Sequence, residues 1–232
     1  YSNTFNITVA ECEHPGYDMS TGKCTQCGCD LAAAIVKGGK TTGYVSFDDA
    51  RTAAQTEENK NCKLWLLTDV AGKIAVSAGD FFICMNKHTA GGLNVAKTAK
   101  LNIIDGTITG TVTVAKTASL SASVLSFLDT VNNTGNNGNF YNCVFGKALN
   151  ARGSNTNFNK CTVNGALNVS GNGVILNDSS VAGKITVNNG ALLRFMGNGC
   201  KCGEMLVKSG GTLEVYSEDH TFSGKLTAQP DS

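Results

Sequence analysis

One period of the sequence reads Gly165-Ala-Leu-Asn-Val-Ser-Gly-Asn-Gly-Val-Ile-Leu-Asn-Asp-Ser-Ser-Val-Ala-Gly183, and it contains the pattern that decides the fold. A glycine is followed by an apolar-x-apolar triplet, a few turn residues and a second short apolar stretch centred on Leu176. The glycines recur at steps of 19, 19, 36, 19, 18, 20 and 21 residues, at Gly72, Gly91, Gly110, Gly146, Gly165, Gly183, Gly203 and Gly224. A nearly constant period of short strands separated by Gly, Asn and Ser turns is typical of a stacked β-solenoid.

The triplet follows most of these glycines, as Ile74-Ala75-Val76, Leu93-Asn94-Val95, Val112-Thr113-Val114, Leu167-Asn168-Val169 and Ile185-Thr186-Val187. Because one turn of chain cannot bury its inward residues alone, the turns must stack on one another. The double step between Gly110 and Gly146 predicts a degenerate turn. Its polar run, 132–139, is the best candidate for a protruding loop that could bind a ligand, and a solvated insertion without a role is the alternative.

Composition narrows the possible partners. The 232 residues carry a net charge of +1, and only 16% of them are charged, so no strong field attracts nucleic acid or an anionic membrane. No apolar run approaches the roughly 20 residues that span a bilayer. We therefore expect a protein that binds no nucleic acid and does not insert into a membrane. We also expect a monomer.

The N-terminal region contains a candidate metal site. Residues 1–11 form a linker or the tail of a preceding module, with an alternating stretch at 5–9 that could be one strand. Cys12-Glu-His14 is followed by Cys24-Thr-Gln-Cys27-Gly28, and four such ligands suit tetrahedral zinc. We predict structural zinc on Cys12, His14, Cys24 and Cys27. Disulfides among the cysteines and free thiols are the alternatives, and Cys29 offers a fifth sulfur that could replace a ligand or pair elsewhere.

The segment between this site and the repeats predicts a hairpin and a cap. Two short apolar runs flank a glycine-rich turn within 31–45, so residues 12–45 combine the Cys/His knuckle with a β-hairpin. A helix follows over 46–60, with Ser46 as its N-cap and Asp49 completing a capping box. This helix is placed to cover the first rung of a solenoid over 61–229, whose open end would otherwise expose unpaired strand groups. Trp65 is expected in the core or the cap, with a stacked sugar as the alternative.

Two parts of the sequence resemble a known kind of protein. The pattern Cys12-x-His14…Gly22-Lys23-Cys24-x-x-Cys27-Gly28 resembles the short cysteine/histidine modules of secreted, multi-domain surface proteins of Gram-positive gut bacteria. The segment Tyr44-Val-Ser-Phe-Asp-Asp-Ala50, followed by Leu64-Trp-Leu-Leu-Thr-Asp-Val70, is similar to the start of their right-handed β-helix domains. The resemblance covers most of residues 12–114. It implies a right-handed parallel β-helix and an extracellular location at the cell surface or cell wall.

An enzyme of the β-helix type must also be considered, because this fold hosts polysaccharide lyases and glycosidases. Glycoside hydrolysis generally needs two carboxylates about 5–9.5 Å apart, which in a solenoid means acids at equivalent outward positions of neighbouring rungs. The expected outward columns contain no acid pair; they comprise Ala75, Asn94, Thr113, Asn150, Asn168 and Thr186, and Phe82, Asn102, Ser121, Asn159, Asn177, Arg194 and Glu214. Cys143 and Cys161 are one period apart, and we expect them to stack in the core, with a disulfide as the alternative.

These patterns together predict an all-β protein, a right-handed parallel β-helix of about nine rungs with a short N-terminal capping helix and a small Cys/His module. The uncharged rung faces favour a non-catalytic cell-surface module, a structural stalk or an adhesin-like binder of host glycan or extracellular protein. The alternative is a carbohydrate-active β-helix enzyme, a polysaccharide lyase or a glycosidase.

Overall fold

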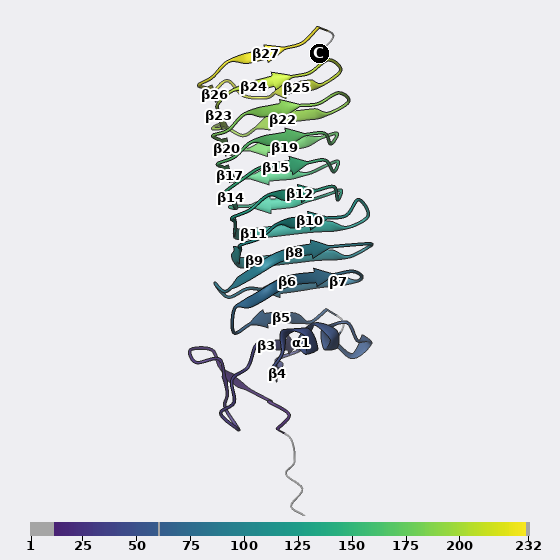
Figure 1. The fold of residues 1–232 in the computed structure, drawn as a ribbon, viewed down its shortest axis with the longest axis vertical. Helices are drawn as coiled ribbons and strands as arrows, with labels where there is room; N and C mark the ends of the chain where they lie inside the picture. The colour runs from purple at the N-terminus through teal and green to yellow at the C-terminus, as the bar shows by residue number, and fades with distance from the viewer. Residues whose placement is uncertain (1–11, 60, 231–232) are drawn as a thin grey trace, which may run out of the picture.

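The protein is a column in which successive turns of a β-solenoid stack on one another, with a small module beneath its N-terminal end (Figure 1). The computed structural model describes residues 12–59 and 61–230. The predicted linker and strand within 1–11 lie outside the described residues. The described part contains a mostly parallel β-solenoid of about nine turns and a single short α-helix, which confirms the predicted fold class.

Each full turn contributes strands to three faces of the column. The first face contains β6 (Val70–Val76), β8 (Thr89–Val95), β10 (Val112–Val114), β12 (Val131–Asn133), β15 (Leu149–Ala151), β18 (Leu167–Val169), β21 (Ile185–Val187), β24 (Met205–Val207) and β27 (Leu226–Ala228). The second contains β5 (Lys63–Leu66), β7 (Asp80–Cys84), β9 (Lys100–Ile108), β11 (Ser119–Phe127), β13 (Asn139–Tyr141), β16 (Asn157–Asn159), β19 (Val174–Asn177), β22 (Leu192–Met196) and β25 (Thr212–Val215). The third contains the ends of β9 and β11 with β14 (Val144–Phe145), β17 (Thr162–Val163), β20 (Ser180–Val181), β23 (Lys201–Cys202) and β26 (Thr221–Phe222).

The core is built from apolar side chains that repeat at the same position of successive rungs. Val131, Leu149, Leu167 and Ile185 pair in register along the first face, and none has exposed area. The alternation within each triplet places its middle residue outside and its flanking residues inside. Close packing explains most of the recurring glycines: a Cβ on Gly183 would collide with the carbonyl oxygen of Gly165 one rung away, whereas the space beside Gly72 is open. The period in the sequence is therefore the circumference of one turn.

The N-terminal end of the solenoid is covered. Strands β3 (Ala33–Lys37) and β4 (Lys40–Tyr44) form the predicted hairpin, and β3 also pairs antiparallel with β5. Helix α1 (Phe47–Ala54) begins at Ser46, whose Oγ accepts from the amide of Asp49, and it buries Phe47, Ala50 and Ala54. It ends earlier than expected and is followed by the 3₁₀ turn η1 (Glu57–Asn59). The cap therefore uses both the hairpin and the helix to close the edge at which parallel stacking starts.

The prediction of a protruding loop at 132–139 is wrong. The segment forms β12 and the start of β13, which continue the ladders of the rungs on either side. Asn133 is fully buried, and Asn137 occupies a left-handed corner with φ of 56°. Asparagine tolerates that conformation well, so the polar run marks the corners of a complete turn. The predicted degenerate rung is present.

One of the two expected outward columns was assigned with the wrong register. On the second face, Ser121 pairs with Asn139, Asn139 with Asn157, and Asn157 with Ile175. Asn159 and Asn177 belong to the neighbouring column, two residues further along each strand. The true column comprises Lys63, Phe82, Asn102, Ser121, Asn139, Asn157, Ile175, Arg194 and Glu214. The error arose because the turn lengths differ by one or two residues between rungs.

The rung cysteines are buried free thiols. Cys143 and Cys161 are each 1% exposed and lie on consecutive rungs, as expected for a core ladder. Each thiol donates to a carbonyl of the preceding rung, Cys143 to Ala122 and Cys161 to Phe140. The hydroxyl of Ser179 makes the equivalent bond to Phe158 in the next rung, at 2.9 Å. These small donors therefore satisfy buried carbonyls at one corner of the shaft.

Candidate metal centre

The knuckle is a compact turn structure held to the cap of the solenoid. Strands β1 (Tyr17–Asp18) and β2 (Lys23–Cys24) pair antiparallel, and the chain then turns sharply through Cys24-Thr-Gln-Cys27-Gly28. The amide of Gly28 donates to the carbonyl of Cys24 at 2.9 Å, and Gly28 has a left-handed φ of +73° that favours glycine. This turn directs the sulfurs of Cys24 and Cys27 to the same side.

The four predicted ligands lie together. The ligand atoms of Cys12, His14, Cys24 and Cys27 all lie within 4.8 Å of one another. The sulfurs of Cys12 and Cys24 are 3.7 Å apart, and Cys27 Sγ is 3.5 Å from His14 Nδ1. A tetrahedral ion with metal–sulfur bonds of about 2.3 Å requires sulfur–sulfur separations of about 3.8 Å. The group is therefore close enough to bind a metal ion, and its donor set of three thiols and one imidazole fits zinc.

Backbone amides prepare the sulfurs of Cys24 and Cys27 to carry negative charge. At Cys12 the amide of His14 acts in the same direction, but desolvation and the neighbouring thiols outweigh it and raise the pKa of this thiol. The amide of His14 donates to Cys12 Sγ, and the amide of Gln26 donates to Cys24 Sγ, both at 3.4 Å. The amide of Cys27 lowers the pKa of the Cys24 thiol, and the amide of Cys29, helped by the Cys29 thiol, lowers the pKa of Cys27 to about 7. Thiolates are the form that coordinates metals, so these donors favour the binding state.

Cys29 lies beside the group without belonging to it. Its sulfur is 3.3 Å from Cys27 Sγ and 3.5 Å from His14 Nδ1. The neighbouring Cys27 thiol raises the pKa of Cys29 to about 11, so Cys29 remains protonated where Cys27 is ionised. In this arrangement the Cys29 sulfur shares a hydrogen bond with the ligand sulfur of Cys27, which is a role that the sequence pattern did not reveal.

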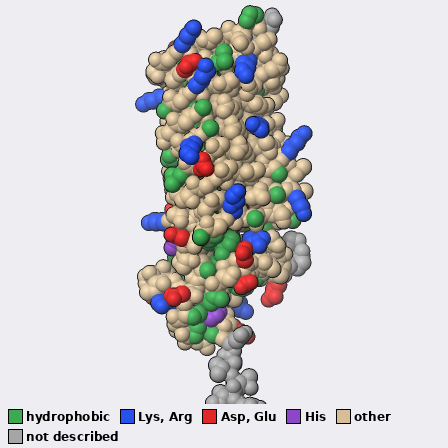
Figure 2. Space-filling model, in the orientation of Figure 1, with side chains coloured by type: hydrophobic (Ala, Val, Ile, Leu, Met, Phe, Trp, Pro, Cys, Tyr) green, Lys and Arg blue, Asp and Glu red, His purple; other side chains and the backbone are tan. Residues whose placement is uncertain are grey.

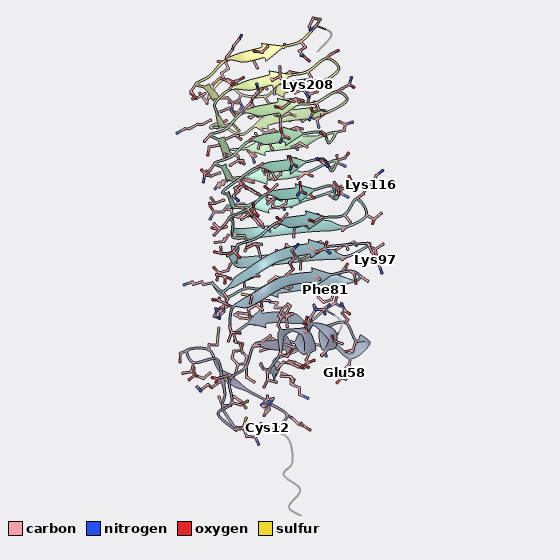
Figure 3. All side chains as sticks on the ribbon, in the orientation of Figure 1. Cys12, Glu58, Phe81, Lys97, Lys116 and Lys208 are labelled. Carbon is pink, nitrogen blue, oxygen red and sulfur yellow. The ribbon has the colours of Figure 1, made fainter. Side chains whose placement is uncertain are left out.

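Two contacts tie the knuckle to the cap. Cys24, Leu31, Ala34 and Leu67 form a small buried cluster between the knuckle and strands β3 and β5. The amide of Gly43 in β4 donates to the carbonyl of His14 at 2.8 Å. The metal-site residues are therefore positioned by the first elements of the solenoid, as Figure 3 shows for Cys12 below the cap.

On the side of the solenoid seen in Figure 2, Lys and Arg side chains are dispersed among fewer Asp and Glu, and neither kind gathers in a patch. On the first face the outward column is Ala75, Asn94, Thr113, Asn132, Asn150, Asn168, Thr186, Leu206 and Thr227. Within the two outward columns of the described rungs, Glu214 is the sole carboxylate. Its Oε2 accepts from Arg194 Nε at 2.6 Å. These columns do not bring two carboxylates together.

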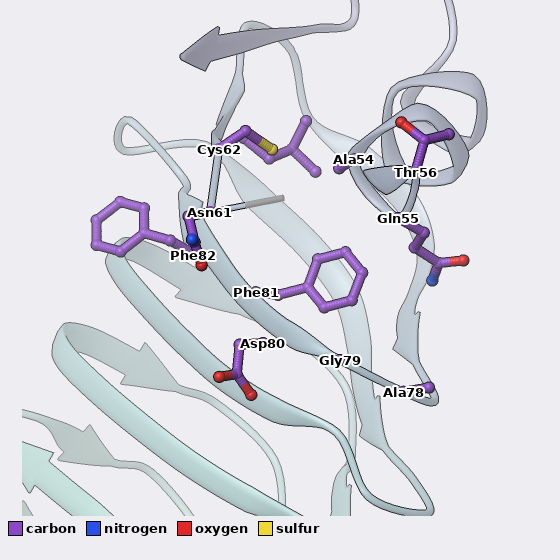
Figure 4. Close-up of a pocket in the computed structure, with 11 residues that line it drawn as sticks. Ala54, Gln55, Thr56, Asn61, Cys62, Ala78, Gly79, Asp80, Phe81 and Phe82 are labelled. Carbon is purple, nitrogen blue, oxygen red and sulfur yellow. The ribbon is translucent and has the colours of Figure 1, made fainter. Parts of the chain in front are cut away.

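A cavity of about 490 Å³ lies between the end of α1 and the first rungs (Figure 4). Phe81 projects into it toward Ala54, and Cys62 and Gln55 line its other walls. Asp80 contributes a carboxylate to the lining of this cavity, and its Oδ1 lies 3.9 Å from Lys100 Nζ. The cavity is a gap in the cap, with a mixed apolar and polar lining.

Trp65 belongs to this cap region. It lies half-buried in β5, paired in register with Ala34 and Cys84, and its Nε1 is buried without a partner among the described residues. This position agrees with the predicted core or cap placement.

Comparisons of the chain with protein families, with curated proteins and with solved structures found no match. No helix in 12–59 or 61–230 has the length and apolar character required to cross a membrane.

Proposed function

We propose that the protein is a non-catalytic module of the cell surface or cell wall, acting outside the cell as a stalk or an adhesin-like binder of host glycan or extracellular protein. The observation that carries this proposal is the largely uncharged character of the two outward columns, in which the charged residues are Lys63, Arg194 and Glu214. A β-helix hydrolase needs paired carboxylates on neighbouring rungs, whereas these columns present mainly asparagine, threonine and serine. Neutral polar side chains on a rigid scaffold are suited to binding.

The rigidity of the scaffold supports a stalk. The side-chain amide of Asn150 donates from Nδ2 to Oδ1 of Asn132 at 2.8 Å, and that of Asn168 donates in the same way to Oδ1 of Asn150 at 2.9 Å. This asparagine ladder ties three rungs together on the outside, while in-register apolar columns tie them inside. A solenoid of this kind holds a binding surface at a fixed distance from its N-terminal module.

We further propose that the knuckle holds one structural zinc ion on Cys12, His14, Cys24 and Cys27. Four protein ligands close the coordination shell, leaving no position for a substrate. Elemental analysis of the purified protein tests this assignment: one zinc per chain is expected, and substituting Cys24→Ser should abolish it. Cys202→Ser is the matched control, because Cys202 is a buried thiol of the rungs. Loss of zinc in the control alone would refute the assignment.

Binding to arrays of glycans and of extracellular matrix proteins tests the main proposal. Saturable binding to one class is expected, without any chemical change in it. If the protein binds neither the glycans nor the matrix proteins, the adhesin-like role is excluded and only the structural role of a stalk remains. The release of reducing ends from plant or mucin polysaccharides would instead support the carbohydrate-active enzyme and overturn the non-catalytic assignment.

A further inference from the structure

The second face of the solenoid carries a cluster of polar side chains whose hydrogen-bonding capacity is unused. Strands β13, β16 and β19 lie side by side, and their outward side chains form two adjacent columns. One column contains Asn139 and Asn157, and the other contains Tyr141, Asn159 and Asn177. We call these five residues the tyrosine face.

The tyrosine face differs from the asparagine ladder of the first face, although both consist largely of asparagine. Among the described residues, none of its four asparagine side chains donates or accepts a hydrogen bond. The Oδ1 atoms of Asn157 and Asn159 are covered by neighbouring atoms and have no partner. A covered amide oxygen without a partner costs free energy. Rotation of the amide to meet a ligand would recover that cost.

Tyr141 gives the face an aromatic platform. Its side chain is 43% exposed, in register with Asn159 on the next rung, and Lys160 Nζ lies 5.9 Å from the centre of its ring. Rungs are about 4.8 Å apart and alternate outward residues about 7 Å apart, so the face spans an area comparable to one or two sugar rings. An exposed ring with amides on its flanks offers an apolar contact and hydrogen bonds at once.

We propose that the tyrosine face binds an uncharged glycan in an extended conformation, with a sugar ring packed on Tyr141 and its hydroxyl groups bonded to the amides of Asn157, Asn159 and Asn177. The glycan is uncharged because none of the five residues of the face is charged. The neighbouring cations are engaged, since Lys160 packs over the Tyr141 ring and Arg194 of the next rung is paired with Glu214. It is extended because the three strands form a flat surface. This inference rests on the proposed glycan-binding function and names the site for it.

The test measures binding of soluble neutral hexasaccharides of glucose, mannose and N-acetylglucosamine by calorimetry and ligand-observed NMR. The wild-type protein should bind at least one of them, and polygalacturonate should not compete. Tyr141→Ala should weaken binding by at least about tenfold, the loss expected when an aromatic anchor is truncated. Asn159→Ala should weaken it measurably, and Tyr141→Phe should retain most of it.

Two matched variants serve as controls. Tyr216→Ala removes a tyrosine that is 61% exposed elsewhere, and Asn150→Ala alters the asparagine ladder on the other face. Both should bind as the wild type does, and far-ultraviolet circular dichroism should confirm that every variant is folded. If Tyr141→Ala and Asn159→Ala bind a neutral glycan normally, the site lies elsewhere and the inference fails while the proposed function stands. If the wild type binds anionic but not neutral glycans, the inference also fails. If it binds no glycan, the inference fails together with the glycan-binding role on which it rests, and the stalk or the binder of extracellular protein remains.

Discussion

Substituting Phe145→Ala is the most informative perturbation of the shaft. Phe145 has no exposed area, and its ring lies 5.1 Å from that of Phe127, 5.6 Å from that of Phe140 and 5.8 Å from that of Phe158, measured between centroids. These four rings come from three consecutive rungs, so they join the turns on either side of the double step in the repeat. The substitution removes a ring that, like that of Phe140, contacts all three others.

The expected cost follows from this environment. Truncating a fully buried phenylalanine lowers the free energy of unfolding by about 3–5 kcal/mol, and each aromatic pair adds about 0.5–1.5 kcal/mol beyond the buried area. With three ring partners, Phe145→Ala belongs near the upper end, at about 4–5 kcal/mol. In a domain of this size each kcal/mol shifts Tm by about 2–4 °C, so a decrease of about 8–20 °C is expected.

Thermal and urea unfolding, followed by circular dichroism, measure the effect. The matched control is Phe82→Ala, because Phe82 is half-buried on the outward column and its ring contacts Lys63 from outside. The control should lose about 1 kcal/mol or less, as substitutions near the surface do. If Phe145→Ala costs no more than Phe82→Ala, the shaft is not close-packed and the parallel stacking described above is wrong.

Three further predictions concern a strained corner and the knuckle. Val124→Asn should raise stability by about 1 kcal/mol, because Val124 is a β-branched residue at a left-handed φ of 56° and is half exposed; a Tm at or below that of the wild type would contradict this. In metal-free protein, alkylation of Cys27 should increase as pH rises and reach half its maximum near pH 7, because its lowered pKa keeps the thiolate present down to about pH 7. Cys29, with a pKa of about 11, should remain unmodified. Equal reactivity of both thiols at pH 8, measured by mass spectrometry, would refute the described hydrogen bond. Chelation should abolish the protection of amide hydrogens from exchange across 12–30 and leave that of the rungs from β8 onward unchanged, because the knuckle has only two short strands and a small core of its own. Loss of protection in β15 or β18 would show that the metal supports the whole solenoid.

The architecture could be predicted from the sequence because a solenoid is locally specified. Most rungs repeat the same apolar-x-apolar triplet, and the usual glycine spacing equals the length of one turn. The N-terminal cap could also be foreseen, since Ser46 and Asp49 are local signals for the start of a helix. The placement of Cys12, His14, Cys24 and Cys27 in one cluster followed from ligand spacing alone.

Other features depend on packing between rungs and were missed. The polar run at 132–139 suggested a loop, yet Asn133 is buried and Asn137 turns a corner of a complete rung. The register of Asn159 and Asn177 could not be fixed, because corner lengths vary from rung to rung. Tyr141 was not singled out either, since its neighbours on the face come from the next two turns of the chain.

The metal centre can be tested most directly by zinc-edge X-ray absorption on protein purified without added metal. The spectrum should show one zinc ion bound by three sulfurs at about 2.3 Å and one imidazole nitrogen at about 2.0 Å, and the signal of the nitrogen should vanish in His14→Ala. A shell of four sulfurs would place Cys29 in the position assigned to His14. A zinc-free protein, with an intact mass showing disulfides among Cys12, Cys24, Cys27 and Cys29, would contradict the assignment altogether.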